Sequence, residues 1–118
     1  MGIVYYGVYP QYFELGRVEA MRELGMTYRE MEEKGTMLPV KHLEINYHGS
    51  ARYDDLLTIK TTITELPGVK LTFNHEVLNE AGELLTTGKV VLVFVNSETR
   101  RPKKAPAYFL DTISLYFS

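Results

Sequence analysis

The chain is 118 residues long, contains no cysteine, and carries a formal net charge of −2 from 13 basic and 15 acidic side chains. This length bounds it to a single domain, residues 1–118, and the near-balanced charge argues against a nucleic-acid or anionic-membrane surface, so we expect small molecules and copies of the chain as partners. Cysteine chemistry and disulfides are excluded, and because neither a signal-peptide pattern nor an apolar run near ~20 residues occurs, we expect a cytoplasmic protein that does not enter membranes.

The first predicted helix covers residues 9–24. Apolar or small residues recur there at i, i+3, i+4 and i+7, while charged residues occupy the other faces. Pro10 suits the first turn, and Gly25 suits the end. Gly16 inside the helix costs roughly 0.5–1 kcal/mol relative to alanine, so we expect another element to pack closely against that face.

A second, shorter helix is predicted over residues 27–34. Thr27 and Glu30 form the sequence pattern of a capping box, in which the threonine side chain accepts from the third helical N–H. Gly35 follows and predicts the end of this helix.

Beyond residue 38 the hydrophobic period changes to two, which predicts strands with one dry face over residues 43–47, 57–63 and 69–77. Residues 90–95 are apolar on both faces, so the strand predicted there needs cover on both sides, and we expect another subunit to supply the second cover. Pro106 predicts the start of a short C-terminal helix. One long helix followed by four antiparallel strands is an α+β arrangement.

The loop before the first helix, together with that helix, resembles the N-terminal signature of the 4-hydroxybenzoyl-CoA thioesterase family of hotdog-fold acyl-CoA thioesterases. The residues that fit are Gly2, Ile3, Val4, Tyr5, Tyr6, Gly7 and Tyr9 in the loop, and Glu14 and Arg17 in the helix. The resemblance covers nearly the whole chain. It implies a hotdog fold, a long central helix packed on an antiparallel sheet, with four strands here and the family's first strand missing. The family's catalytic Asp would fall two places before Met1, so we expect Met1 to be an internal methionine of a longer natural chain.

The same resemblance implies an enzyme that hydrolyses the thioester of a small acyl-CoA at a homodimer interface, within a homodimer or homotetramer. No cofactor is expected, since coenzyme A belongs to the substrate, and the spacing of the histidines predicts no metal site. The resemblance also singles out the backbone N–H of Tyr6, beside Gly7 and Val8, as the group that polarises the thioester carbonyl at the helix start. The alternatives are a catalytically impaired acyl-CoA-binding protein of this fold and an oligomerising module without a ligand.

Glu14 is the nearest substitute for the missing acid, one turn into the helix. Its alternative role is a structural ion pair with Arg17, three residues further on. His75, on an apolar strand face, is more consistent with a hydrogen-bonded core imidazole than with a catalytic one.

The resemblance also implies that basic side chains hold the phosphates of coenzyme A. The candidates are Lys70, after a predicted turn, and Arg100 and Arg101, in a basic segment that continues to Lys104. The alternative for each of them is a solvated surface charge.

Overall fold

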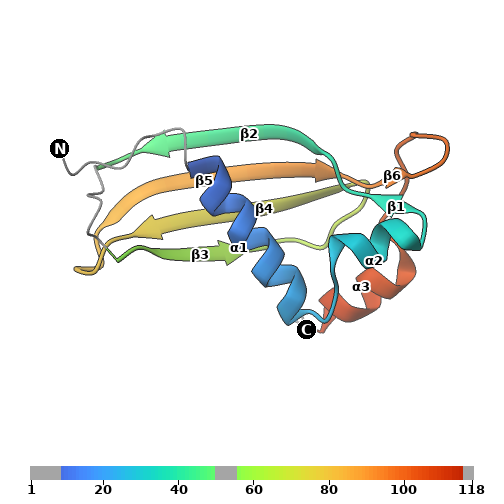
Figure 1. The fold of residues 1–118 in the computed structure, drawn as a ribbon, viewed down its shortest axis with the longest axis horizontal. Coiled ribbons are helices and arrows are strands. Elements are labelled where there is room, and N and C mark those ends of the chain that lie inside the picture. Colours follow the sequence, from blue (N-terminus) through green and yellow to red (C-terminus); the bar gives the residue numbers. More distant parts are fainter. Residues whose placement is uncertain (1–8, 50–55, 116–118) are drawn as a thin grey trace.

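The computed structural model describes residues 9–49 and 56–115, in which one long helix lies across an antiparallel sheet (Figure 1). The helices are α1 (Tyr9–Glu23), α2 (Tyr28–Glu33) and α3 (Ala107–Ser114). The main sheet has the order β2-β5-β4-β3, formed by β2 (Val40–Tyr47), β5 (Leu84–Val93), β4 (Lys70–Leu78) and β3 (Thr58–Thr62). A second, two-stranded sheet pairs β1 (Thr36–Met37) with β6 (Val95–Asn96). The predicted α+β hotdog arrangement is confirmed.

Both N-terminal helices form where the local patterns predict them. The buried face of α1 is the row Tyr9, Phe13, Arg17 and Met21, which recurs every fourth residue. Gly25 ends this segment with a φ of 78°, a left-handed conformation that favours glycine. In α2 the N-cap hydroxyl of Thr27 accepts a hydrogen bond from the backbone N–H of Glu30 at 3.1 Å.

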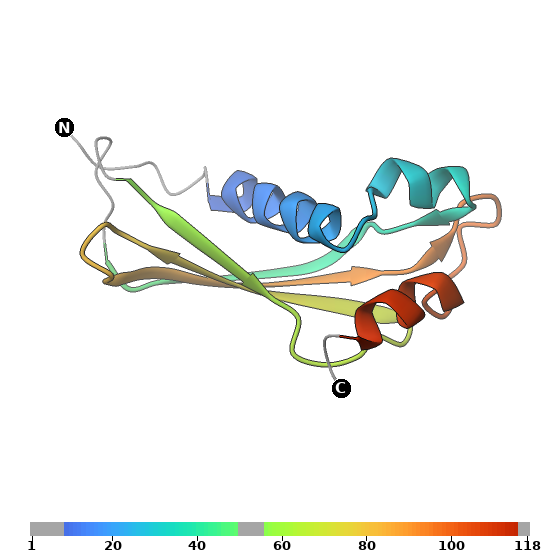
Figure 2. The same cartoon turned by 90° about the horizontal axis from the view of Figure 1, so that it is seen from below.

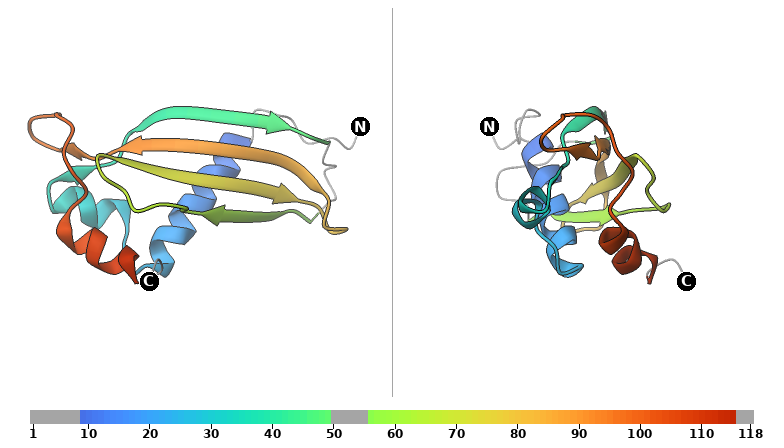
Figure 3. Two further views of the ribbon diagram at one scale, coloured as in Figure 1. Left: turned by 180° about the vertical axis from the view of Figure 1, so that it is seen from behind. Right: turned by 90° about the vertical axis from the view of Figure 1, so that its right-hand side faces the viewer.

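The sheet has two unlike faces. On β4 the side chains of Leu71, Phe73, His75 and Val77 are buried under the helices, whereas the residues between them point to the opposite face. Figure 2 shows α1 and α2 together on one side of the sheet, and the view from behind in Figure 3 shows the other face without a helix over its centre. The hydrophobic core therefore lies between α1 and the sheet.

The strand predicted over residues 90–95 begins at Leu84, earlier than expected, and also ends earlier than expected. β5 ends at Val93, Phe94 leaves the strand, and residue 95 already belongs to β6. The chain's own α3 covers Phe94, whose ring meets that of Phe109 edge to face with centroids 5.4 Å apart. Val91, on the face away from α1, is only half-buried. Part of the cover that we expected from another subunit is thus intramolecular.

Two glycines let α1 lie close to the sheet. A Cβ on Gly16 would clash with Thr61 Oγ1 on β3, and a Cβ on Gly88 of β5 would clash with the Phe13 ring. The prediction that another element packs tightly against Gly16 is confirmed, and that element is the sheet. Gly88 is the counterpart that sequence patterning did not indicate.

Candidate active site

A cavity of about 200 Å³ opens between α1 and β2. It is lined by Pro10, Gln11, Glu14 and Arg17 from α1, by Val40 and Leu43 from β2, and by Val90 from β5. The helical members follow one stripe of α1, because residues three and four apart share a face. Within the described residues β2 pairs only with β5, so the cavity lies beside a sheet edge with exposed apolar side chains, Val40 (51%) and Leu43 (40%).

The two charged side chains of this cavity are not paired with each other. Arg17 is 8% exposed, Glu14 is exposed, and no ion pair within 4.0 Å joins them. In residues 9–49 and 56–115 the ion pairs are Arg22 with Glu19, Arg29 with Glu33, and His42 with Glu44. A structural ion pair between Glu14 and Arg17, the alternative to a catalytic Glu14, is therefore wrong.

Within the part of the chain that the structure describes, Arg17 is a buried charge with an unused hydrogen-bond donor, which was not predicted from the sequence. Its Nε is buried and has no hydrogen-bond partner among the described residues. The neighbouring Tyr28 hydroxyl also lacks a hydrogen bond of good geometry to them, although the guanidinium is close enough to act on it. Burial raises the pKa of Tyr28, and the charge of Arg17 opposes that rise. The burial of Arg17 could have been predicted from its position in an otherwise apolar row of α1.

His75 behaves as a core histidine. It is 1% exposed, its ring stacks on Phe13 with centroids 4.7 Å apart, and a hydrogen bond of 3.0 Å joins its Nδ1 to Thr61 Oγ1. Burial, and secondarily the charge of Arg17, lowers the pKa of His75 from 6.5 to about 4. The imidazole is therefore neutral at neutral pH and holds α1 to β4 and β3.

We expect the free energy of unfolding to fall as the pH drops from 6.5 to about 4, because His75 gains a proton more readily in the unfolded chain. Its contribution is complete above pH 6.5 and is lost as the pH approaches the folded-state value. His75→Phe keeps a ring for Phe13 and cannot titrate, so its loss over this interval should be smaller in denaturant unfolding. His48→Phe, at an exposed position, is the control. Equal losses for His75→Phe and the wild type would contradict this assignment.

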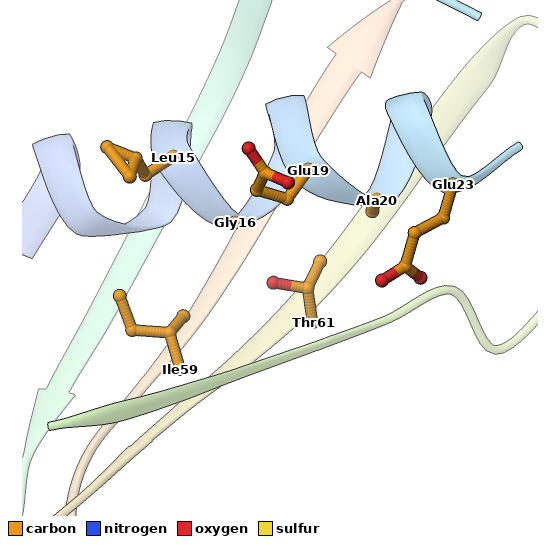
Figure 4. A pocket seen from close by; sticks show the side chains of 7 residues that line it. All are labelled: Leu15, Gly16, Glu19, Ala20, Glu23, Ile59 and Thr61. Atoms are coloured by element: carbon orange, nitrogen blue, oxygen red, sulfur yellow. The ribbon is translucent and has the colours of Figure 1, made fainter. Parts of the chain in front are cut away.

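A second cavity, of about 230 Å³, lies on the other side of α1, above β3 (Figure 4). It is lined by Leu15, Gly16, Glu19, Ala20 and Glu23 from α1 and by Ile59 and Thr61 from β3. Glu19 bonds Arg22 at 2.7 Å, and none of the described residues that line this cavity is basic. Of these two cavities, the one beside β2 contains both a buried cation, Arg17, and a carboxylate that belongs to none of the described ion pairs, Glu14.

The predicted site residues are only partly brought together. Tyr6, Gly7 and Val8 lie outside the described residues, immediately before α1. Arg100 and Arg101 lie in the turn after β6, where Arg100 has a φ of 64°, and both are exposed. Lys70 begins β4 near that end of the sheet, but it alternates with buried Leu71 and so points away from the face that carries α1.

The described part of the chain offers no cluster of three or more His, Asp or Glu side chains arranged to hold a metal ion. None of its helices combines the length and apolar character needed to cross a membrane.

A long helix packed across an antiparallel sheet, with a ligand-sized cavity beside the helix, is the architecture of a hotdog-fold protein. Superposition agrees: a DHNA-CoA thioesterase from Staphylococcus aureus matches with a TM-score of 0.86 at 33% identity, over 99% of this chain and 78% of that one. A hypothetical protein from Thermus thermophilus, TT1821, matches with a TM-score of 0.87 at 29% identity, over 98% of this chain and 87% of that one. Among curated proteins, the acyl-CoA thioester hydrolase YbgC of Escherichia coli O6:H1 is 29% identical over 105 residues, 89% of this chain and 78% of that protein.

The chain belongs to the Thioesterase-like superfamily, whose family model matches residues 1–113. It is an enzyme of the thioester hydrolase class.

Proposed function

We propose that this protein hydrolyses the thioester of small acyl-CoA molecules in the cytoplasm, without a cofactor besides the coenzyme A of the substrate. The observation that carries the proposal is the cavity beside β2, where an exposed carboxylate outside any described ion pair, Glu14, stands next to a buried cation, Arg17. The names of two similar proteins, the DHNA-CoA thioesterase of Staphylococcus aureus and the acyl-CoA thioester hydrolase YbgC, support an acyl-CoA ester as substrate class.

In the proposed reaction Glu14 acts as general base. Its carboxylate takes a proton from a water molecule while the water oxygen attacks the thioester carbonyl carbon. The tetrahedral intermediate then expels the thiolate, the carbon–sulfur bond breaks, and the thiolate takes up the proton to give coenzyme A and the free acid. The backbone N–H groups of the residues that precede α1 in the chain, Tyr6 foremost and then Gly7 and Val8, are proposed to stabilise the oxyanion.

The test is turnover measured with a thiol-specific chromogenic reagent, which is clean here because the chain has no cysteine to react with it. We expect short acyl-CoA esters to release coenzyme A at a rate proportional to enzyme concentration. Binding of these esters in calorimetry without any turnover would instead indicate a catalytically impaired acyl-CoA-binding protein. If the protein neither bound nor hydrolysed these esters, the proposal would be overturned.

We further propose a homodimer, alone or within a tetramer, that closes the cavity over the edge of β2. Seven of the eight residues of β2 are exposed, including apolar ones, and the strand has only one neighbour in the described part of the chain. Such an edge can accept another strand along the side of β2 that faces away from β5.

Light scattering at micromolar concentration should therefore report twice the mass of one chain or a higher even multiple. Leu43→Lys places a charge on the proposed interface and should produce monomers. Leu15→Lys is the matched control, since Leu15 is exposed on α1 beside the other cavity. A wild-type chain that stays monomeric would contradict the dimer, and equal masses for both variants would remove β2 from the interface.

Arg100 and Arg101 are proposed to bind the phosphates of coenzyme A. Replacing both with Gln should weaken binding of coenzyme A in calorimetry, and the difference from the wild type should shrink at high salt because exposed charge pairs are screened. Lys70 points away from the face that carries α1, and Lys70→Gln tests whether this residue also contributes to binding of coenzyme A. Unchanged binding of the double variant at low salt would assign both arginines to a solvated turn.

A further inference from the structure

The most costly feature of the cavity beside β2 is the buried guanidinium of Arg17. It is 8% exposed, and within residues 9–49 and 56–115 no carboxylate lies within 4.0 Å of it. A charge removed from water is destabilising unless an opposite charge or a full set of hydrogen bonds compensates it. Among the described residues Arg17 therefore has no anionic partner, and it lines a cavity in which an anion could reach it.

The described protein groups around Arg17 include no carboxylate within 4.0 Å, although the guanidinium is close enough to interact with the Tyr28 hydroxyl. Tyr28 lacks a hydrogen bond of good geometry to it, and His75 is a neutral imidazole whose Nε2 is itself without a partner in the described part of the chain. Glu14 is three residues earlier on the same helix, but its carboxylate is exposed, so water screens it from a ligand more than it screens the buried guanidinium. A bound anion would consequently gain more from Arg17 than it would lose to Glu14.

The cavity limits the size of such a ligand. Its volume of about 200 Å³ is close to that of an engineered apolar cavity of ~150 Å³ that holds one benzene molecule. Its apolar walls, Val40, Leu43 and Val90, suit methylene groups. The Cβ atoms of Glu14 and Arg17 are expected about 5–6 Å apart, as for residues three apart on a helix, which a chain of about four or five carbons can bridge.

We propose that Arg17 binds a terminal carboxylate on the acyl group, so that the preferred substrates are short dicarboxylic acyl-CoA esters. This rests on the proposed thioesterase function and extends it from the reaction to the acyl group. The scissile carbonyl lies beside Glu14, the methylene groups contact the apolar walls, and the distal carboxylate forms a charge-assisted pair with the guanidinium.

The experiment compares glutaryl-CoA with pentanoyl-CoA, which has the same number of acyl carbons and no second carboxylate. For the wild type, kcat/KM should favour glutaryl-CoA by about 10- to 100-fold, the usual effect of one hydrogen-bonded charge. Arg17→Met should abolish this preference and Arg17→Lys should retain part of it. Arg22→Met, which removes an exposed arginine of the same helix, should leave the ratio unchanged. An equal kcat/KM for both esters in the wild type, or an unchanged ratio in Arg17→Met, would overturn the proposal.

A second measurement separates ligand binding from a structural role. Replacing an uncompensated buried charge by an apolar side chain of similar size should leave the Tm unchanged or raise it, whereas a structural arginine would lower the Tm of Arg17→Met. If neither ester is hydrolysed, the thioesterase proposal fails, and calorimetric Kd values for the two esters still test Arg17. Equal affinities there, or a lowered Tm with an unchanged preference, would count against the carboxylate site.

Discussion

Glu14→Gln should lower kcat by roughly 10²- to 10⁴-fold while leaving the Kd of the acyl-CoA substrate within a few-fold of the wild type. The amide is nearly the same size as the carboxylate, so the cavity keeps its shape, but it cannot take a proton from water. Because general-base assistance acts in the transition state, the loss should appear in kcat and kcat/KM together. Steady-state rates of coenzyme A release give kcat, and calorimetry gives the Kd.

Glu23→Gln is the matched control for this experiment. Glu23 is also exposed on α1, but it lines the cavity on the β3 side. We expect its substitution to change kcat by less than about twofold, since a surface charge away from the site contributes little. If Glu14→Gln keeps more than about a tenth of the wild-type rate, Glu14 is not the general base. Another group of the assembly must then activate the water molecule.

Gly88→Ala should destabilise the protein by about 1–3 kcal/mol, because the added methyl group would overlap the Phe13 ring. Phe13 is completely buried and its ring also stacks on His75, so it cannot turn away into solvent. Relief requires α1 to lift from the sheet, which would loosen the cavity wall as well. Denaturant unfolding measures the free energy, and a fall in Tm of at least roughly 4 °C should accompany it.

Gly68→Ala is the corresponding control, since nothing in the described structure lies within 4 Å of a Cβ at that position. Combining Gly88→Ala with Phe13→Leu should cost less than the sum of the two single changes, because the smaller side chain makes room for the methyl group. Additive costs, or a Gly88→Ala variant as stable as the wild type, would show that α1 does not lie as close to β5 as the structure has it.

Much of the fold could be predicted from local patterns. The spacing of apolar residues predicted α1, and Thr27 with Glu30 predicted α2, because helices depend on neighbours three and four residues away. The end of β5 could not be predicted, since an uninterrupted apolar run has no period that marks where a strand stops. Phe94 leaves the strand to meet Phe109, a residue of the C-terminal helix.

The candidate site was predictable only in part. Glu14 and Arg17 were recognised from the resemblance to hotdog thioesterases, and the structure places both in one cavity. Lys70 was grouped with Arg100 and Arg101, although the alternation along β4 directs its side chain away from the face that carries α1. The residues from β2 that complete the cavity were missed, because strand order cannot be read from the period of one strand.

The amino-acid sequence by itself determined the class of fold, the family and the close contact at Gly16, since each is written in short-range patterns or in residue identity. The tertiary structure alone decided that Glu14 and Arg17 do not pair with each other, that Gly88 receives the Phe13 ring, and that β2 borders the cavity. The physical reason is that these features depend on how α1 crosses the sheet, and that crossing is set by contacts between residues far apart in the chain.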